Sequence, residues 1–278
     1  MAGAWRGGLG FANGANYGAN TGASTMTSVF TAGSSFVKGA WTQLTASTTN
    51  DIAWLMITGS TMTSGGSYFA VDLAVGGSGS EVAIITNLSW SSTGGLASSY
   101  MLPVAIPIGT RVSARVSGNN ATDPFHMHVA GFDDMYMSAG SGCSVDTYGY
   151  STSTNIGTAV DPGGSANTKG SWVQITSSTT NDMSGFCFVF DTQTISGSAG
   201  TTEWLYDVGI GAGGSEQVIV PNFYQLAYMS GGTTPSFVVS PYYPIPIASG
   251  TRIAARAQCS KTTTPDRTLG ITVYGVRQ

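Results

Sequence analysis

The feature that most constrains this chain is an internal repeat. Residues 38–51 (KGAWTQLTASTTND) and 169–182 (KGSWVQITSSTTND) differ at only four of 14 positions, at a spacing of 131. Three further pairs of segments match in the same order, at spacings that rise from 135 to 144: Asp72–Glu81 with Asp207–Glu216, Pro103–Arg115 with Pro244–Arg256, and Val129–Gly131 with Val273–Gly275. Because the order is kept while the spacing grows, we expect two copies of one fold that differ by short loop insertions.

The repeat also sets the domain boundaries. It predicts an N-terminal arm at 1–11, a first unit at 12–133, a linker at 134–142 and a second unit at 143–278. The arm is rich in glycine, and the linker contains the sequence SAGSG. A unit of about 130 residues is large enough to bury its own core.

Short runs of β-branched and aromatic residues recur through both units, separated by clusters of Gly, Ser and Thr. In the first unit they lie at 52–57, 68–73, 82–85, 112–116 and 125–129. No amphipathic helical stripe longer than two turns interrupts them, and regularly spaced strands of this kind are typical of antiparallel sandwiches and jelly rolls. We therefore predict an all-β protein made of two tandem antiparallel β-sandwich (jelly-roll-like) domains related by internal duplication.

Composition excludes several classes of protein. Only 9% of residues are charged and the net charge is −4, so the basic surface of a nucleic-acid-binding protein is not expected. Apolar runs such as 186–190 are far shorter than the ~20 residues of a membrane span, and we expect no membrane association. The N-terminus shows no secretory signal. A surface built of Ser, Thr and Gly suits a protein that is covered by neighbours in an assembly.

Half of the charged residues recur at equivalent positions. Twelve of the 24 charges form six pairs: Lys38 and Lys169, Asp51 and Asp182, Asp72 and Asp207, Glu81 and Glu216, Arg111 and Arg252, Arg115 and Arg256. Arginine suits bidentate pairing with carboxylates. We interpret these residues as structural ion pairs, in which Glu81 contacts Arg111 or Arg115, and Glu216 contacts Arg252 or Arg256. A ligand or ion site present twice is the alternative.

The residues that would carry a metal or cofactor are sparse. His126 and His128 have strand spacing, but they need a third ligand, for which Asp123 and Asp133 are the nearest candidates. A G-x-G-x-x-G sequence at 209–214 leads into a β-rich run and not a helix, so it lacks the helix N-terminus that binds a pyrophosphate. Cys143, Cys187 and Cys259 form no C-x-x-C pair. We expect no metal and no cofactor.

Catalytic patterns are equally weak. The chain has no G-x-S-x-G nucleophile elbow. Asp133 and Asp134 could serve a glycosidase only if they faced one site, whereas neighbouring strand residues point to opposite faces. Trp90 lies in a polar Ser-Trp-Ser-Ser-Thr stretch and could be exposed as part of a sugar-binding platform, while Trp41 and Trp172 recur and are expected in the core. We predict that the protein is not an enzyme.

Two blocks of the repeat resemble a known module. These are Asp-x-x-x-Gly-x-x-Gly-Ser-Glu, at 207–216 and 72–81, and the Pro-Ile-Pro-Ile and Gly-Thr-Arg-Ile-Ala-Ala-Arg sequences within 244–256, with a weaker copy at 103–115. They resemble a β-sandwich module of structural proteins of tailed bacteriophages. The resemblance covers most of both units and implies a virion component, made in the cytoplasm of the host bacterium, of the capsid decoration, cement or tail-associated type. It supplies no catalytic residues.

The resemblance leaves two functions open. The first is a capsid decoration or cement protein that binds the major capsid protein and neighbouring virion subunits, forms homo-oligomers and stabilises the head shell. The alternative is a tail-fibre or receptor-binding protein that recognises a host surface glycan. Within the arm, Trp5, Arg6 and Leu9 stand among Gly and Ala residues with too little apolar area to order the segment alone. We therefore expect these three residues to contact a partner.

Overall fold

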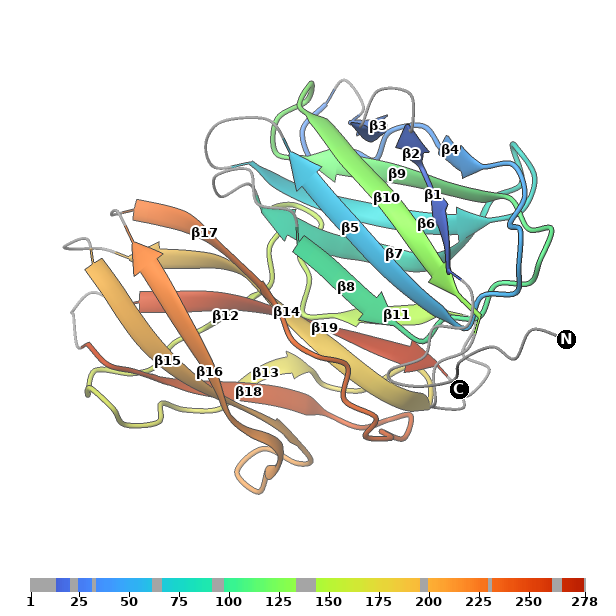
Figure 1. Ribbon diagram of the computed structural model, residues 1–278. Coiled ribbons are helices and arrows are strands. Elements are labelled where there is room, and N and C mark those ends of the chain that lie inside the picture. The colour runs from blue at the N-terminus through green and yellow to red at the C-terminus, as the bar shows by residue number, and fades with distance from the viewer. Residues whose placement is uncertain are drawn as a thin grey trace, which may run out of the picture.

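The computed structural model describes residues 14–20, 25–31, 34–61, 67–91, 98–133, 144–195, 200–229, 232–261 and 267–277. This part of the chain forms nineteen strands and no helix, which confirms the all-β class (Figure 1). The first unit contains β1 (Gly14–Tyr17), β2 (Ala19–Asn20), β3 (Thr25–Phe30), β4 (Thr42–Thr45), β5 (Trp54–Thr61), β6 (Tyr68–Val75), β7 (Val82–Ser91), β8 (Ser98–Leu102), β9 (Val112–Gly118) and β10 (Pro124–Phe132). The second contains β11 (Val145–Tyr148), β12 (Thr158–Val160), β13 (Val173–Thr176), β14 (Met183–Ile195), β15 (Gly200–Ile210), β16 (Gln217–Met229), β17 (Gly232–Val239), β18 (Ile253–Cys259) and β19 (Arg267–Arg277).

Each unit is a sandwich of two antiparallel layers. In the first, a sheet of order β2-β3-β10-β5-β8, with β1 also on β10, faces the layer β7-β6-β9-β4. In the second, β17-β14-β19, with β11 and β12 on β19, faces β16-β15-β18-β13. The strand order of one unit is repeated in the other, so the prediction of two tandem sandwiches related by duplication is confirmed.

The two units share one sheet, which the sequence did not predict. Strand β11 pairs with β19 of its own unit along one edge and, in parallel, with β7 of the first unit along the other, at Val145 and Ile85. This pairing joins two layers into a nine-stranded sheet that runs through both units. It is the one parallel pairing among the described strands.

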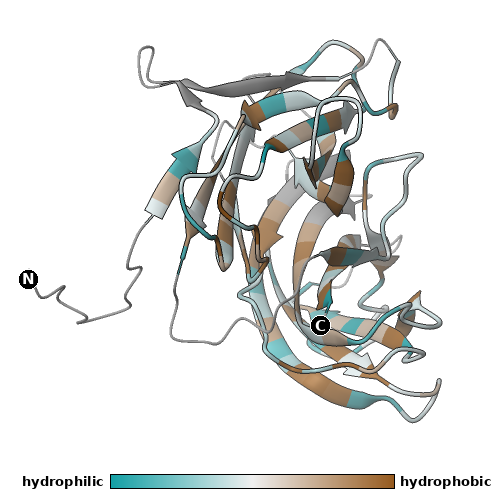
Figure 2. Ribbon diagram, turned by 90° about the vertical axis from the view of Figure 1, so that its right-hand side faces the viewer, coloured by the Kyte–Doolittle hydropathy of each residue, from teal (hydrophilic) through white to brown (hydrophobic). Residues whose placement is uncertain are grey.

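Local sequence explains why strands turn where they do. The turn between β6 and β7 has positive φ at Gly76 (105°) and Gly79 (82°), and its counterpart between β15 and β16 has the same at Gly211 (107°) and Gly214 (84°). Glycine adopts this conformation without the cost that a Cβ atom brings. Along the strands, hydrophobic and hydrophilic residues alternate in many places (Figure 2), as expected for strands with one face toward a core.

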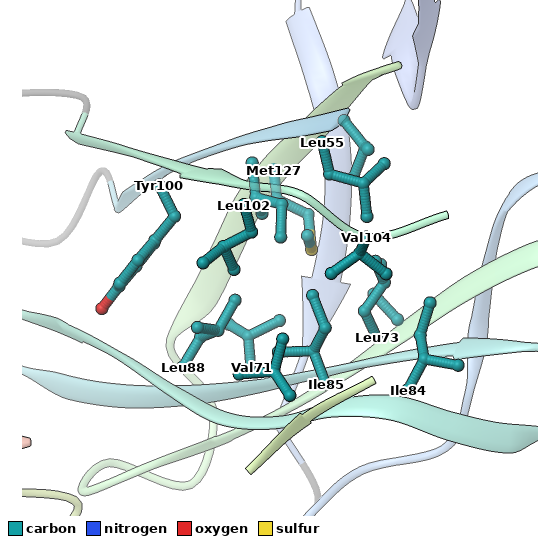
Figure 3. Packing of buried hydrophobic residues seen from close by; sticks show 14 of the residues in the cluster. Leu55, Val71, Leu73, Ile84, Ile85, Leu88, Tyr100, Leu102, Val104 and Met127 are labelled. Carbon is teal, nitrogen blue, oxygen red and sulfur yellow. The ribbon is translucent and has the colours of Figure 1, made fainter. Parts of the chain in front are cut away.

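The core of the first unit lies between its two layers and includes residues of the second unit. Leucine, isoleucine and valine side chains from β5, β6, β7 and β8 interdigitate there (Figure 3), and full burial of each stabilises the fold by about 1.5–3 kcal/mol. The same cluster contains five buried residues of the second unit: Val145, Cys187, Val189, Tyr274 and Val276. The second unit therefore closes one side of the first sandwich with the outer face of its own sheet.

Candidate functional site

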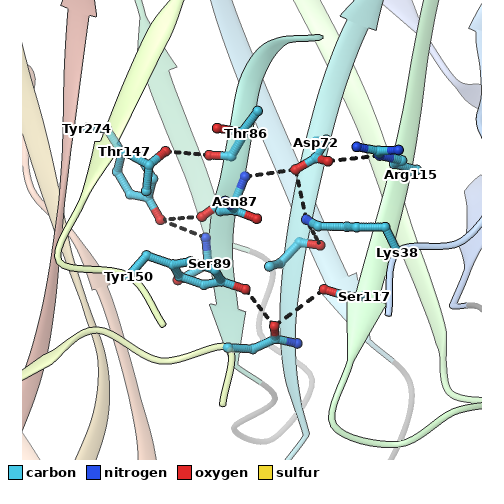
Figure 4. Close-up of polar contacts among 12 residues, drawn as sticks. Lys38, Asp72, Thr86, Asn87, Ser89, Arg115, Ser117, Thr147, Tyr150 and Tyr274 are labelled. Atoms are coloured by element: carbon cyan, nitrogen blue, oxygen red, sulfur yellow. Dashed lines mark hydrogen bonds and ion pairs between the residues drawn. The ribbon is translucent and has the colours of Figure 1, made fainter. Parts of the chain in front are cut away.

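A buried carboxylate organises the charged residues of the first unit. Asp72 on β6 accepts hydrogen bonds from Lys38 Nζ (2.8 Å), from Arg115 Nε (2.8 Å) and from the backbone N–H of Asn87 (2.9 Å). The guanidinium of Arg115 also lies over the ring of Trp41, 4.4 Å from its centroid. Figure 4 shows this cluster across β6, β7 and β9. Asp72 thereby fixes a lysine, an arginine and the backbone of a neighbouring strand at one point.

The second unit repeats this cluster atom for atom. Asp207 on β15 accepts from Lys169 Nζ (2.9 Å), Arg256 Nε (2.8 Å) and the backbone N–H of Asn222 (2.9 Å). Arg256 lies 4.6 Å from the ring centroid of Trp172. Burial alone would raise the pKa of Asp207, but the Asn222 N–H and the two cations outweigh it and hold the pKa below its ordinary value. The carboxylate is therefore ionised at neutral pH.

A second ion pair in each unit staples the glycine turn to the neighbouring strand. Arg111 Nη1 lies 3.0 Å from Glu81 Oε1, and Arg252 Nη1 lies 2.9 Å from Glu216 Oε1. Both arginines also donate to the carbonyl at the start of the turn, Gly76 or Gly211. A hydrogen bond from its own backbone N–H and those from Arg111 and Gly79 lower the pKa of Glu81.

The structure therefore separates the six predicted ion-pair residues into two sets. Glu81 and Glu216 pair with Arg111 and Arg252, whereas Arg115 and Arg256 pair with Asp72 and Asp207. The sequence reasoning missed the two aspartates as organising residues, although both recur at equivalent positions. Their signal was present in the recurrence of Lys38 and Lys169 together with the aspartates, because a recurring cation in a chain with so few charges indicates a recurring carboxylate partner.

The joint between the units depends on polar residues that the repeat does not share. The hydroxyl of Tyr274 accepts from the Ser89 N–H (2.8 Å) and donates to the Asn87 carbonyl (2.9 Å). Asn155 accepts from the Ser117 hydroxyl (3.3 Å) on the outer face of the first unit. Figure 4 shows Tyr274, Thr147 and Tyr150 of the second unit lying against β7 and its neighbours. The two Tyr274 bonds satisfy backbone groups of β7, and the Asn155 bond holds a side chain of β9.

A groove of about 720 Å³ lies beside this joint, lined by residues of β7, β11 and β13 and by Arg277. At its wall, Asp146 accepts from Arg277 Nε (2.8 Å) and from Asn181 Nδ2 (2.9 Å). Burial raises the pKa of Asp146, but the bonds from Arg277 and Asn181 outweigh it and lower the pKa overall. The charged groups of the groove thus neutralise one another.

The described residues contain no group of three or more His, Cys, Asp or Glu side chains placed to hold a metal ion. His126 and His128 lie two apart on β10, and burial lowers the pKa of His128. Asp123, one of the two candidate third ligands, accepts instead from Ser67 and Asn120. The glycine sequence at 209–214 runs from the end of β15 through the turn into β16.

The expectation that Trp90 could be exposed is wrong. Strand β7 extends to Ser91, so Trp90 belongs to a strand and not to a loop. Its side chain is only 2% exposed and packs against Tyr100, Phe125 and Phe237. The flanking serines made the segment look like a loop, but Ser89 and Ser91 are themselves buried.

Several expected features fall outside the described residues. These are the arm with its candidate partner contacts Trp5, Arg6 and Leu9, the linker at 134–142, and Cys143. Cys187 and Cys259 are free and buried. No helix in the described part of the chain is long and apolar enough to cross a membrane.

No protein-family model and no curated protein matches the chain. Among solved structures, it is similar to the N-terminal CBM22-1–CBM22-2 tandem domain of Xyn10C from Paenibacillus barcinonensis, at 9% sequence identity. The similarity covers 89% of this chain and 99% of that chain, with a TM-score of 0.26. A similarity of this size carries no argument about what this chain binds.

Proposed function

We propose that the chain is a non-enzymatic structural protein of a bacteriophage virion, a capsid decoration or cement protein that binds the head shell and stabilises it. The resemblance of the two blocks at 72–81 with 103–115 and at 207–216 with 244–256 to a phage β-sandwich module motivates this proposal. Its partners would be the major capsid protein and neighbouring virion subunits.

The observation that carries the proposal is the engagement of the recurring charges inside each unit. Asp72 and Glu81 pair with Lys38, Arg111 and Arg115, and the same set pairs in the second unit. Charges that might have formed a duplicated ligand site thus hold strands in register. The remaining surface consists mainly of uncharged strands and turns, which supports attachment through β-surface contact and strand addition instead of charge.

The shared sheet supports the same function. A strand pairing, the Tyr274 hydrogen bonds and a common core make the joint between the sandwiches continuous with the fold of the first unit. Two sandwiches held in this way present a long body whose ends can contact neighbouring capsid subunits. Such a bridge resists separation of the subunits, which is what a cement protein does.

The aromatic side chains give the glycan-binding alternative little support. Trp54, Trp90 and Trp204 are buried, while Trp41 and Trp172 each lie against an arginine. The three buried rings are closed to a sugar, and an arginine covers one face of each of the two partly buried rings. We therefore retain glycan recognition as an outcome of the test and not as a second proposal.

The test is co-sedimentation of the purified chain with phage particles that lack it, followed by heating of the particles. We expect saturable binding and a higher temperature of DNA release. A chain without residues 2–10 should keep its fold by circular dichroism and bind more weakly, if Trp5, Arg6 and Leu9 contact the shell. Absence of binding to particles, together with retention on a host glycan array, would refute the decoration function.

A further inference from the structure

The joint between the two units consists of a surface that receives an added strand, called the acceptor, and the strand that is added to it, called the donor. The acceptor is the edge and outer face of β7, and the donor is β11, which pairs with that edge at Ile85. Behind the pairing, Thr147 Oγ1 donates to the Thr86 carbonyl and Asn155 Nδ2 donates to the Tyr68 carbonyl. Thr147 and Asn155, which donate these two bonds, belong to the second unit, and the two carbonyls that accept them belong to β7 and β6 of the first.

The repeat gives the chain a second acceptor. Strand β16 is the counterpart of β7, because Asn222 and Asn87 have the same positive φ (50° and 56°) and the same bond to a buried aspartate. Within the described part of the chain, β16 pairs with β15 along one edge and with nothing along the other. The edge that β11 covers on β7 is therefore open on β16.

The repeat also gives the chain a second donor. Strand β1 is the counterpart of β11, because Tyr17 and Tyr148 both accept a backbone N–H bond through the hydroxyl, from Thr49 and Thr180 respectively. The glycine that follows each tyrosine has positive φ, 81° at Gly18 and 78° at Gly149. Strand β1 pairs with β10, and no other described strand covers its second edge.

The open acceptor is apolar where its counterpart is polar and buried. Tyr224 and Leu226 on β16 are each 55% exposed, whereas Ser89 and Ser91, the residues at their positions on β7, are 0% and 7% exposed. Large exposed apolar side chains on an edge strand are a hazard unless a partner covers them. This contrast indicates that the β16 face is covered in the assembled state.

A cavity marks the place of the missing contact. It has a volume of about 100 Å³ and is lined by Asn167, Glu203, Leu205, Tyr224, Gln258 and Ser260. Glu203 and Gln258 stand at the positions of Tyr68 and Ser117, the two residues that Asn155 contacts in the first unit. The outer face of the second unit thus has a hollow beside the two positions that Asn155 contacts in the first unit.

We propose that the β16 face binds the β1 edge of a second copy of this chain, as the β7 face binds β11 within the chain. The donor and the acceptor cannot meet in one molecule, because β1 and β16 lie at opposite ends of it (Figure 1). The contact is therefore head-to-tail, and each copy added exposes a new acceptor. Such heterologous contacts build rings when the rotation closes and filaments when it does not.

The residues at the new contact are compatible with this pairing. Pro221 replaces Thr86 on the acceptor and lacks an N–H, but in the internal joint the carbonyl of Thr86 is the group that receives the side-chain bond, and proline keeps its carbonyl. Asn16 replaces Thr147 on the donor and offers an amide N–H for that carbonyl. In the internal joint the aromatic residue is Tyr274, on the donor side, and it faces Ser89. In the proposed contact the aromatic residue is Tyr224, on the acceptor side at the position of Ser89, and Ala130 stands at the position of Tyr274. This inference does not depend on the proposed place of the protein in a virion.

The experiment uses sedimentation velocity of the full chain and of two variants. The acceptor variant carries Tyr224→Ser and Leu226→Ser, the residues that β7 has there, and the donor variant carries Asn16→Lys at an exposed position of β1. We expect concentration-dependent association of the wild type and monomers of either variant alone. Mixing the two variants should give dimers and nothing larger, because one intact donor then meets one intact acceptor. Ile108→Ser, a similar change at an exposed apolar residue that belongs to neither β1 nor β16, is the matched control and should associate as the wild type does.

Three results would overturn the proposal. The first is a wild type that stays monomeric at its highest attainable concentration. The second is association of the acceptor variant equal to that of the wild type, with circular dichroism showing both folded. The third is a mixture of the two variants that remains monomeric while each is folded. Binding of the β16 face to particles but not to a second copy would assign that face to a different protein.

Discussion

The buried aspartate of the second unit gives the sharpest prediction about stability. In Asp207→Asn the side chain keeps its shape and can still accept from the Asn222 N–H, but Lys169 and Arg256 lose the negative charge between them. Its amide nitrogen must then face one of the two cations. The variant therefore tests whether the repeated cluster stabilises the fold through charge.

The size of the effect follows from the exposure of the partners. Removing one member of a buried ion pair costs about 3–5 kcal/mol. Lys169 and Arg256 are 18% and 31% exposed, so water solvates them partly after the change, and we expect a loss of about 2–3 kcal/mol in the free energy of unfolding. A loss of that size lowers Tm by roughly 4–12 °C.

Differential scanning calorimetry at several pH values is the assay. Because the folded state lowers the pKa of Asp207 below its usual 3.8, the stabilisation is complete above that pH and is lost as the pH falls through the folded pKa. The deficit of the variant should therefore be largest near neutral pH and shrink in acid. Asp161→Asn, the same change at an exposed turn residue, should leave Tm almost unchanged.

A Tm of Asp207→Asn equal to that of the wild type at neutral pH would refute this reasoning. A deficit that persists unchanged in acid would show that shape and not charge is responsible. Arg115→Met is a weaker test than a change of the aspartate, because Asp72 keeps Lys38 as a partner when Arg115 is removed.

Three other parts of the fold can be tested by single substitutions or by labelling. Tyr274→Phe leaves the buried Ser89 N–H and Asn87 carbonyl without their side-chain partner, so urea denaturation should show a loss of about 1–3 kcal/mol in the free energy of unfolding. Tyr224→Phe, at an exposed site, is the control and should have no measurable effect. Equal effects of the two changes would contradict the importance of the joint. Gly157→Ala would place a Cβ 2.5 Å from the Ile271 backbone and should lower the free energy of unfolding by at least about 1–3 kcal/mol. In Gly213→Ala, the control, the added Cβ meets nothing within 4 Å, and the free energy of unfolding should not change. A Gly157→Ala variant as stable as the wild type would show that β12 lies further from β19. Burial raises the pKa of Cys187 to about 12, so iodoacetamide at mildly alkaline pH should label this thiol only after unfolding. Peptide mass spectrometry measures the labelling, and rapid labelling of the native protein would contradict the burial of Cys187.

The sequence predicted the features that the two copies share. The matched blocks showed where the repeated strands, the glycine turns and the recurring charged residues lie in the chain, because each of these features recurs as a short segment of sequence. The pairing of Glu81 with Arg111 and not Arg115 could not be decided in this way. It depends on strand register, since Arg111 lies just before β9 and meets Glu81, whereas Arg115 lies within β9 and meets Asp72.

The features that distinguish the copies were harder to predict. The joint depends on positions where the repeat is broken, such as Tyr274 against Ala130 and Ser89 against Tyr224. A single strand of four residues, β11, carries no sign in its sequence that it adds to β7 as well as to β19. Trp90 was misplaced for the same reason, since its burial comes partly from Phe237 of the other unit.

The copy number of the chain in purified particles tests our proposal that it is a structural component of the phage head. Quantitative mass spectrometry of intact virions, with isotope-labelled peptides from this chain and from the major capsid protein, gives the ratio of the two. We expect a copy number of the same order as that of the major capsid protein, retained in heads separated from their tails. A few copies that separate with the tails, or none in the particle, would contradict it.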